Sequence, residues 1–195
     1  MRRLFIGILA VAVVFGMSMG VMAGDYGPNI DVDQPGDQNY AEVIDNATDI
    51  RPDSSINLVQ SGFSNWAEVE SEEGADTWMD LSQSGNNNYM DVSSRHVGYT
   101  DVIVDQWGND NSANVTAESN RAHIVVHQGG FNNAANIYSD DASDSLATIG
   151  QYGNNNSASI TQQDFWNDEE VEFVEATITQ NGNHNTAVVE QKYND

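Results

Sequence analysis

The sequence predicts an all-β fold, a β-solenoid of seven stacked strand-turn-strand repeats with a cross-β arrangement. Three observations favour it. A glutamine recurs seven times along the chain, at spacings of 26, 23, 23, 22, 23 and 29 residues. A glycine follows each glutamine by two positions and an asparagine follows it by five. Around this motif, apolar and polar residues alternate with period two, which is typical of strands and not of helices.

The repeated positions can be given in full. The glutamines are Gln34, Gln60, Gln83, Gln106, Gln128, Gln151 and Gln180. The glycines are Gly36, Gly62, Gly85, Gly108, Gly130, Gly153 and Gly182. The asparagines are Asn39, Asn65, Asn88, Asn111, Asn133, Asn156 and Asn185. Apolar residues also recur two positions before each glutamine, and seven and nine positions after it, so each repeat has one apolar face.

The first element is a predicted signal peptide over residues 1–23. Arg2 and Arg3 precede an apolar run, and small residues end it at Ala23. Its removal leaves four basic and 30 acidic residues, so the mature net charge is 4 − 30 = −26. We expect no membrane span in the mature chain. Residues 24–33 form a short N-terminal segment, and residues 34–195 form the repeat domain.

Each repeat is predicted to be two short strands joined by a turn. In the third repeat, Leu81 and Gln83 point inward, Gly85 supplies the turn, and Asn88 and Met90 point back to the same side. One such unit cannot bury its apolar face or pair its backbone edges. Stacking at about 4.8 Å solves both problems, and it also places identical amides one rung apart. The glutamines and asparagines are therefore expected to form hydrogen-bonded ladders that carry assembly.

Composition and charge exclude several classes of protein. The 195 residues contain 6 Lys and Arg against 30 Asp and Glu, so almost nothing could neutralise phosphates, and we expect no nucleic-acid partner. There is no cysteine for disulfides or thiolate ligands. His96, His123, His127 and His184 are scattered, and we expect no catalytic, cofactor-binding or metal site. A metal held by His123 and His127 together is an alternative, against a simple solvated pair.

The motif resembles the curlin repeat of bacterial curli fibres, whose pattern is Ser, five residues, Gln, four residues, Asn, five residues, Gln. The first Gln and the Asn are present in all seven units. The opening Ser is kept as Ser54 and Ser145, is Thr77 and Thr100 in two units, and is replaced by Pro28, Ala122 and Val174. The closing Gln is kept as Gln162 and Gln191 and is replaced by Asp45, Ser71, Ser94, Ala117 and Ser139.

The resemblance implies a secreted, extracellular subunit that passes the periplasm and crosses the outer membrane unfolded, through a dedicated pore with chaperones. It would then polymerise with itself on the cell surface, aided by a nucleator subunit, into functional amyloid fibres of the biofilm matrix for adhesion and cell aggregation. Residues 24–33 would take the place of the export-targeting segment. Because both end repeats keep the full motif, a major subunit is favoured over a minor nucleator.

Two other classes of protein are alternatives. Long β-helices include enzymes, but those chains are longer and line a cleft with basic and acidic groups. A soluble solenoid that binds a surface, ice or carbohydrate without polymerising would need end caps or a regular threonine column. The outward columns here are mixed. One aligns Tyr40, Trp66 and Tyr89, predicted either to serve lateral association or adhesion or only to pack across neighbouring strands. Another aligns Glu42, Glu68 and Asp91, predicted to oppose assembly by repulsion.

Overall fold

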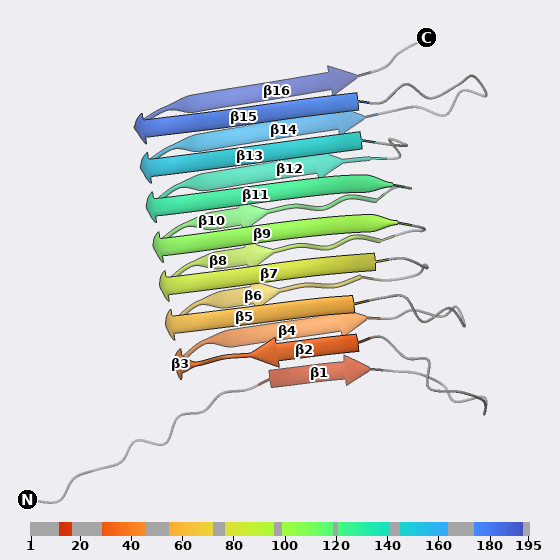
Figure 1. Cartoon of the computed structure of the whole chain (residues 1–195), viewed down its shortest axis with the longest axis vertical. Coiled ribbons are helices and arrows are strands. Elements are labelled where there is room, and N and C mark those ends of the chain that lie inside the picture. The colour runs from red at the N-terminus through yellow and green to blue at the C-terminus, as the bar shows by residue number, and fades with distance from the viewer. Residues whose placement is uncertain are drawn as a thin grey trace, which may run out of the picture.

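The computed structural model describes residues 12–16, 29–45, 55–71, 77–95, 99–118, 121–140, 145–163 and 174–192. Sixteen β-strands and no helix occur in these ranges. The strands stack in sequence order from the N-terminal end of the column to its C-terminal end (Figure 1). The expected all-β solenoid is therefore confirmed.

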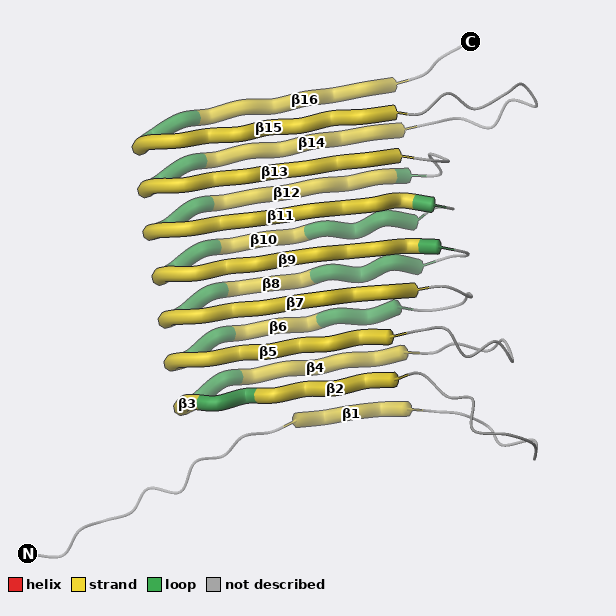
Figure 2. Tube along the Cα trace, in the orientation of Figure 1, coloured by secondary structure: helices red, strands yellow, loops and turns green. Residues whose placement is uncertain are grey.

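The strands form two parallel sheets that lie face to face (Figure 2). One sheet, called sheet B here, has the order β15-β13-β11-β9-β7-β5-β2, and β3 pairs with β5 beside it. Its strands are β2 (Asn29–Asp33), β3 (Gly36–Asp37), β5 (Ser55–Phe63), β7 (Thr77–Asn86), β9 (Thr100–Asn109), β11 (Ala122–Phe131), β13 (Ser145–Asn154) and β15 (Val174–Asn183).

The other sheet, sheet A, has the order β1-β4-β6-β8-β10-β12-β14-β16. Its strands are β1 (Ala12–Gly16), β4 (Tyr40–Asp45), β6 (Trp66–Glu68), β8 (Tyr89–Asp91), β10 (Ser112–Asn114), β12 (Ala134–Ser139), β14 (Ser157–Gln163) and β16 (Thr186–Lys192). Each repeat thus contributes one strand to sheet B, turns at its glycine, and returns through sheet A.

The register of the stack follows the sequence repeat. Gln106 pairs with Gln83 on one side and with Gln128 on the other, and its whole strand aligns residue by residue with both neighbours. The alternation of burial along β9 and β11 is that of strands with one face inside. Apolar residues from both sheets, such as Leu81 and Met90, fill the space between them and are fully buried. Period-two patterning therefore places one face of every repeat in a continuous core.

The turn between the two strands has a fixed conformation. Its glycine lies at φ between 107° and 133° in all seven repeats. Two residues later the chain adopts a left-handed conformation near φ 55°, as at Asn87 and Asn132. Only glycine adopts the first of these conformations without strain, whereas asparagine tolerates the second. The glycine of the motif is thus required by backbone geometry.

The expected count of seven full units is slightly too high, because about five turns are complete and enclosed by neighbours on both sides. The first repeat is interrupted: β2 ends at Asp33 and β3 begins at Gly36, since Pro35 between them has no N–H for the ladder. In the last repeat, no described strand pairs with the outer edge of β15 or β16, and β16 is partly exposed along both faces. The first and last repeats are therefore end rungs.

The second strand of a repeat has two lengths. In repeats two to four it spans three residues, and a residue with positive φ follows shortly afterwards: Glu70, Ser93 or Thr116. In repeats five to seven the strand runs on for six or seven residues. Period-two patterning alone does not distinguish the two groups.

Some predicted features lie outside the described residues. The signal peptide is described only at β1, which pairs with β4, and the segment 24–33 is described only from residue 29. The longest connection, residues 164–173, also lies outside. No helix in the described ranges is both long and apolar enough to cross a membrane.

Candidate assembly site

The glutamine ladder runs through the interior of the stack. The side-chain Nε2 of each repeat glutamine except the last donates to Oε1 of the next, over N to O distances of 2.5 to 2.9 Å. From the second repeat onward, Nε2 also donates to a backbone carbonyl of sheet A in the preceding repeat, as Gln83 does to Trp66 at 3.0 Å. A glutamine side chain that would be costly to bury alone is therefore hydrogen-bonded to the glutamines of the neighbouring repeats.

The asparagine ladder runs beside the turns, and it points the opposite way. Nδ2 of Asn88 donates to Oδ1 of Asn65 in the preceding repeat at 3.1 Å, and the backbone N–H of Asn88 donates to the same oxygen at 3.1 Å. Nδ2 also donates to the carbonyl of Gly108 in the following repeat at 3.0 Å. Each interior asparagine thus ties three successive repeats together.

The turn glycines approach one another closely. A Cβ built on Gly108 would lie 2.0 Å from the carbonyl oxygen of Gly130. The five other turn glycines that are followed by a further rung give distances of 1.9 to 2.1 Å. Gly182 is different, because its nearest neighbour is the Asn185 amide at 3.6 Å. Glycine is therefore required by contact as well as by φ wherever a further rung follows.

A third contact lies at the other end of the strands, between the residue that closes one repeat and the residue that opens the next. Where the closing Gln is a serine, its hydroxyl bonds the opening hydroxyl of the next repeat: Ser71 with Thr77 at 3.3 Å, Ser94 with Thr100 at 3.1 Å, and Ser139 with Ser145 at 3.2 Å. Where the closing residue is Ala117, the opening residue is Ala122, and both are buried. The substitutions are therefore matched in pairs.

The kept closing glutamines form a ladder of one step. Gln162 donates to Gln191 at 3.0 Å, and Gln191 donates to the carbonyl of Glu175 at 3.2 Å. Oε1 of Gln162 is buried and has no hydrogen-bond partner among the described residues, since the preceding repeat has Ser139 at this position. A third ladder through the whole stack is absent from the described repeats, as the sequence departures indicate.

In the end rungs, some ladder groups lack the partner that they have inside the stack. Gln180 donates to the carbonyl of Ser157, but within the described repeats it has no further glutamine to donate to. Gln34 donates to Gln60, but no described residue donates to its Oε1. All fourteen sequence-predicted ladder residues are thus brought into two columns, and the two ends of each column are complementary.

The outward aromatic column predicted from the sequence aligns as expected. Tyr40, Trp66 and Tyr89 are register partners on sheet A. The ring centroids of Tyr40 and Trp66 are 4.4 Å apart at an interplanar angle of 39°. Beside them, Glu42, Glu68 and Asp91 are also register partners.

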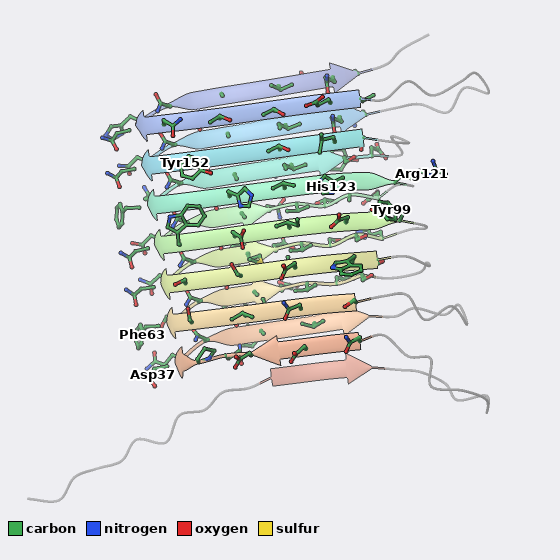
Figure 3. All side chains as sticks on the ribbon, viewed as in Figure 1. Asp37, Phe63, Tyr99, Arg121, His123 and Tyr152 are labelled. Carbon is green, nitrogen blue, oxygen red and sulfur yellow. The ribbon has the colours of Figure 1, made fainter. Side chains whose placement is uncertain are left out.

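The two histidines of β11 lie on the outer face of sheet B, where Figure 3 labels His123. Nδ1 of His123 lies 2.9 Å from Asp101, and Nδ1 of His127 lies 3.1 Å from Asp105. Four residues along a strand separate the rings by about 13 Å. They therefore pair with different carboxylates and do not converge on one metal ion. No group of three His, Asp or Glu in the described part of the chain is arranged to hold a metal.

Sequence reasoning missed a second aromatic contact. Trp107 and Tyr152 lie in repeats four and six, yet their ring centroids are 5.8 Å apart. Gly129 is the register partner of both, and a Cβ there would lie 2.3 Å from Nε1 of Trp107. The signal in the sequence is an aromatic, a glycine and an aromatic at one offset in consecutive repeats.

These features define the class of the molecule: a two-sheet parallel β-solenoid whose repeats are joined by internal amide ladders. No family model, curated protein or solved structure matches the chain.

Proposed function

We propose that the chain is a secreted structural subunit that polymerises end to end into curli-like functional amyloid fibres. In this role it is a major subunit at the cell surface, and the fibres serve adhesion and cell aggregation in a biofilm matrix. The proposal assigns no catalytic, cofactor or metal site. Export through an outer-membrane pore with chaperones, and nucleation by a second subunit, belong to the same proposal through the resemblance to curlin repeats.

The observation that carries the proposal is the complementarity of the two ends. Gln180 has a side-chain N–H that, in an interior glutamine, donates to the glutamine of the next repeat. Gln34 has an Oε1 that, in an interior glutamine, accepts from the glutamine of the preceding repeat. Likewise, Oδ1 of Asn185 corresponds to the oxygen that accepts two bonds from the next repeat inside the stack. A second copy placed with its first repeat on the last repeat of the first copy continues both ladders in the same direction.

Backbone pairing would add to the docked interface. β15 and β16 present ten and seven residues along their outer edges, and within the described residues no strand covers them. Exposed edges of parallel strands are templates for further pairing. At the opposite end, no described strand pairs with the outer edge of β2, whereas β1 covers β4 over five residues. Docking there requires β1 to leave, and removal of the expected signal peptide, residues 1–23, would release it.

The decisive experiment uses Gly182. Inside one chain, alanine at this position is strained by its φ of 111°, but its Cβ meets nothing closer than 3.6 Å, whereas the same Cβ at an interior turn also meets backbone at about 2 Å. In a docked pair, Gly36 of the next copy would lie where the next glycine lies in the interior. A chain carrying Gly182→Ala should therefore join a filament through its first repeat and block the next addition. One part of variant in ten parts of wild type should shorten filaments severalfold in electron micrographs.

The control is Gly150→Ala, whose Cβ would make an ordinary contact of 3.5 Å with Tyr152. It should leave filament length unchanged in the same mixture. Gln180→Ala, which keeps the turn intact, should slow growth more than Gln106→Ala does. Wild-type protein that yields no thioflavin-binding filaments with reflections near 4.8 and 10 Å would refute the proposed function. Filaments of unaltered length with Gly182→Ala would refute the docking geometry alone.

A further inference from the structure

Two columns of side chains lie next to each other on the outer face of sheet A, and both are confined to the first three repeats. The aromatic column is Tyr40, Trp66 and Tyr89, and the acidic column is Glu42, Glu68 and Asp91. In the later repeats the same offsets carry small or neutral residues: Ser112, Ala134, Ser157 and Thr186 in one column, and Asn114, Asn136, Ser159 and Val188 in the other. One end of this face therefore differs chemically from the other.

The aromatic column leaves ring surface open to solvent. Trp66 is 45% exposed and Tyr89 is 40% exposed. Tyr40 tilts against Trp66 with centroids 4.4 Å apart, so the first two rings form one contiguous apolar surface. The faces of such rings attract cations as well as apolar groups.

The acidic column has no cationic partner among the described residues. The hydroxyl of Tyr40 donates to Glu42 at 2.6 Å, and the amide of Asn114 donates to Asp91 at 2.5 Å. Ion pairs of Arg95, His123, His127 and Lys192 lie elsewhere. In the later repeats, by contrast, Asn136 bonds Asn114 at 3.0 Å and Ser159 bonds Asn136 at 3.3 Å, so that part of the column is satisfied internally.

The pKa values of Tyr40 and Tyr89 are both raised, in part by the carboxylates of the acidic column. The pKa of Tyr40 is raised first by its hydrogen bond to Glu42, then by slight burial, and then by the charges of Glu42 and Glu68. The pKa of Tyr89 is raised by burial and by the charges of Asp91 and Glu68. Both phenols thus sense two carboxylates of the acidic column.

The spacing of the carboxylates selects among cationic ligands. Register partners on neighbouring strands lie about 4.8 Å apart, and the aromatic column runs alongside, two residues or about 6.6 Å along the strand. Three extended backbone bonds span about 3.5 Å, so ammonium groups joined by three or four methylenes lie about 5 or 6 Å apart. A linear aliphatic polyamine therefore matches the pitch of the acidic column, and its methylenes and cationic charge suit the adjacent rings.

We propose that this face of the first three repeats binds linear polyamines lengthwise, with ammonium groups on Glu42, Glu68 and Asp91 and the chain against the aromatic column. The surface lies within a single chain, so the proposal does not depend on polymerisation. A divalent cation would need ligands converging on one point, whereas this arrangement offers a row.

The test is calorimetric titration of the protein with spermidine, with Mg²⁺ as the comparison probe at equal ionic strength. The variant Glu42→Gln, Glu68→Gln, Asp91→Asn should weaken spermidine binding about tenfold, which corresponds to about 1.4 kcal/mol. The matched control is Asp31→Asn, Asp33→Asn, Asp80→Asn on the outer face of sheet B, which removes the same charge and should change affinity less than twofold. Circular dichroism of both variants shows whether the strands are retained.

A second variant separates charge from stacking. Trp66→Ser with Tyr89→Ser keeps all three carboxylates and should weaken spermidine severalfold while leaving Mg²⁺ binding unchanged. Equal weakening by the acidic triple variant and its control would overturn the proposal in favour of diffuse attraction to a highly negative chain. Mg²⁺ binding with the same affinity and the same dependence on the acidic column would also overturn it, in favour of simple cation binding.

Discussion

Replacing Gly108 by alanine tests whether the turns hold the stack together. Gly108 lies at φ 107°, and a Cβ there would lie 2.0 Å from the backbone oxygen of Gly130. The Gly130 oxygen cannot move away without loss of another contact, because it also accepts from Nδ2 of Asn111 at 3.2 Å. The substitution must therefore separate two rungs at the turn.

The expected cost has two parts. Backbone strain at a φ that side chains rarely adopt costs about 1 to 3 kcal/mol. Separation of the rungs weakens the Asn111 contact and its neighbours, and each lost hydrogen bond costs about 1 kcal/mol. The free energy of unfolding should fall by about 3 to 5 kcal/mol in total.

Two other glycines provide the comparison. At Gly129 the obstructing atoms belong to the Trp107 side chain, which can rotate, so Gly129→Ala should cost an intermediate amount. At Gly150 the contact is ordinary, and Gly150→Ala should be neutral or should stabilise by up to about 1 kcal/mol. Urea unfolding at concentrations that prevent polymerisation measures all three. If Gly108→Ala and Gly150→Ala differ by less than about 1 kcal/mol, the turn contact does not stabilise the fold.

Three further predictions concern the ladders, the charge and the first strand. Gln106→Leu removes an amide that is hydrogen-bonded to Gln83, Gln128 and the Tyr89 carbonyl, so the free energy of unfolding in urea should fall by about 3 kcal/mol. Gln162→Leu also removes a buried oxygen without a partner among the described residues, so the free energy of unfolding should fall by about 1 kcal/mol or less. With a formal charge of −24, the chain should polymerise with a shorter lag as salt rises or as pH falls towards the pI near 4.1, and a lag that lengthens with salt would contradict this. Residues 24–195 should grow filaments faster than residues 1–195, because β1 covers β4 in the longer chain, and equal growth rates measured by thioflavin fluorescence would show that β1 does not obstruct docking.

The stack and its ladders were predictable from the sequence because they arise from strict repetition. Glutamine, glycine and asparagine recur at fixed offsets, and parallel in-register pairing turns each offset into a column. The placement of Gln106 between Gln83 and Gln128 therefore follows from spacing alone. The aromatic column at Tyr40, Trp66 and Tyr89 was predictable for the same reason.

Features that differ between repeats were not predictable in the same way. The early end of the second strand in repeats two to four depends on a positive φ at residues such as Glu70 and Ser93, which are not typical of that conformation. The close contact of Trp107 with Tyr152 depends on Gly129 leaving room for both rings. Fewer turns are enclosed than the seven repeats of the sequence, because Pro35 interrupts the first repeat and no described strand covers the last one. At Glu70, Ser93, Gly129 and Pro35, one residue overrides the pattern locally.

The opposite directions of the two ladders would affect the electrostatics of a column that lengthens by end-to-end addition. In an α-helix all peptide dipoles align, so charge accumulates at the ends. Here each glutamine donates towards the C-terminal end, as Gln83 does to Gln106, while each asparagine donates towards the N-terminal end, as Asn88 does to Asn65. The two rows of amide dipoles therefore oppose each other, and strands themselves contribute little net dipole. A column of this kind can lengthen without building a macrodipole, and its ends stay equally polar whatever its length.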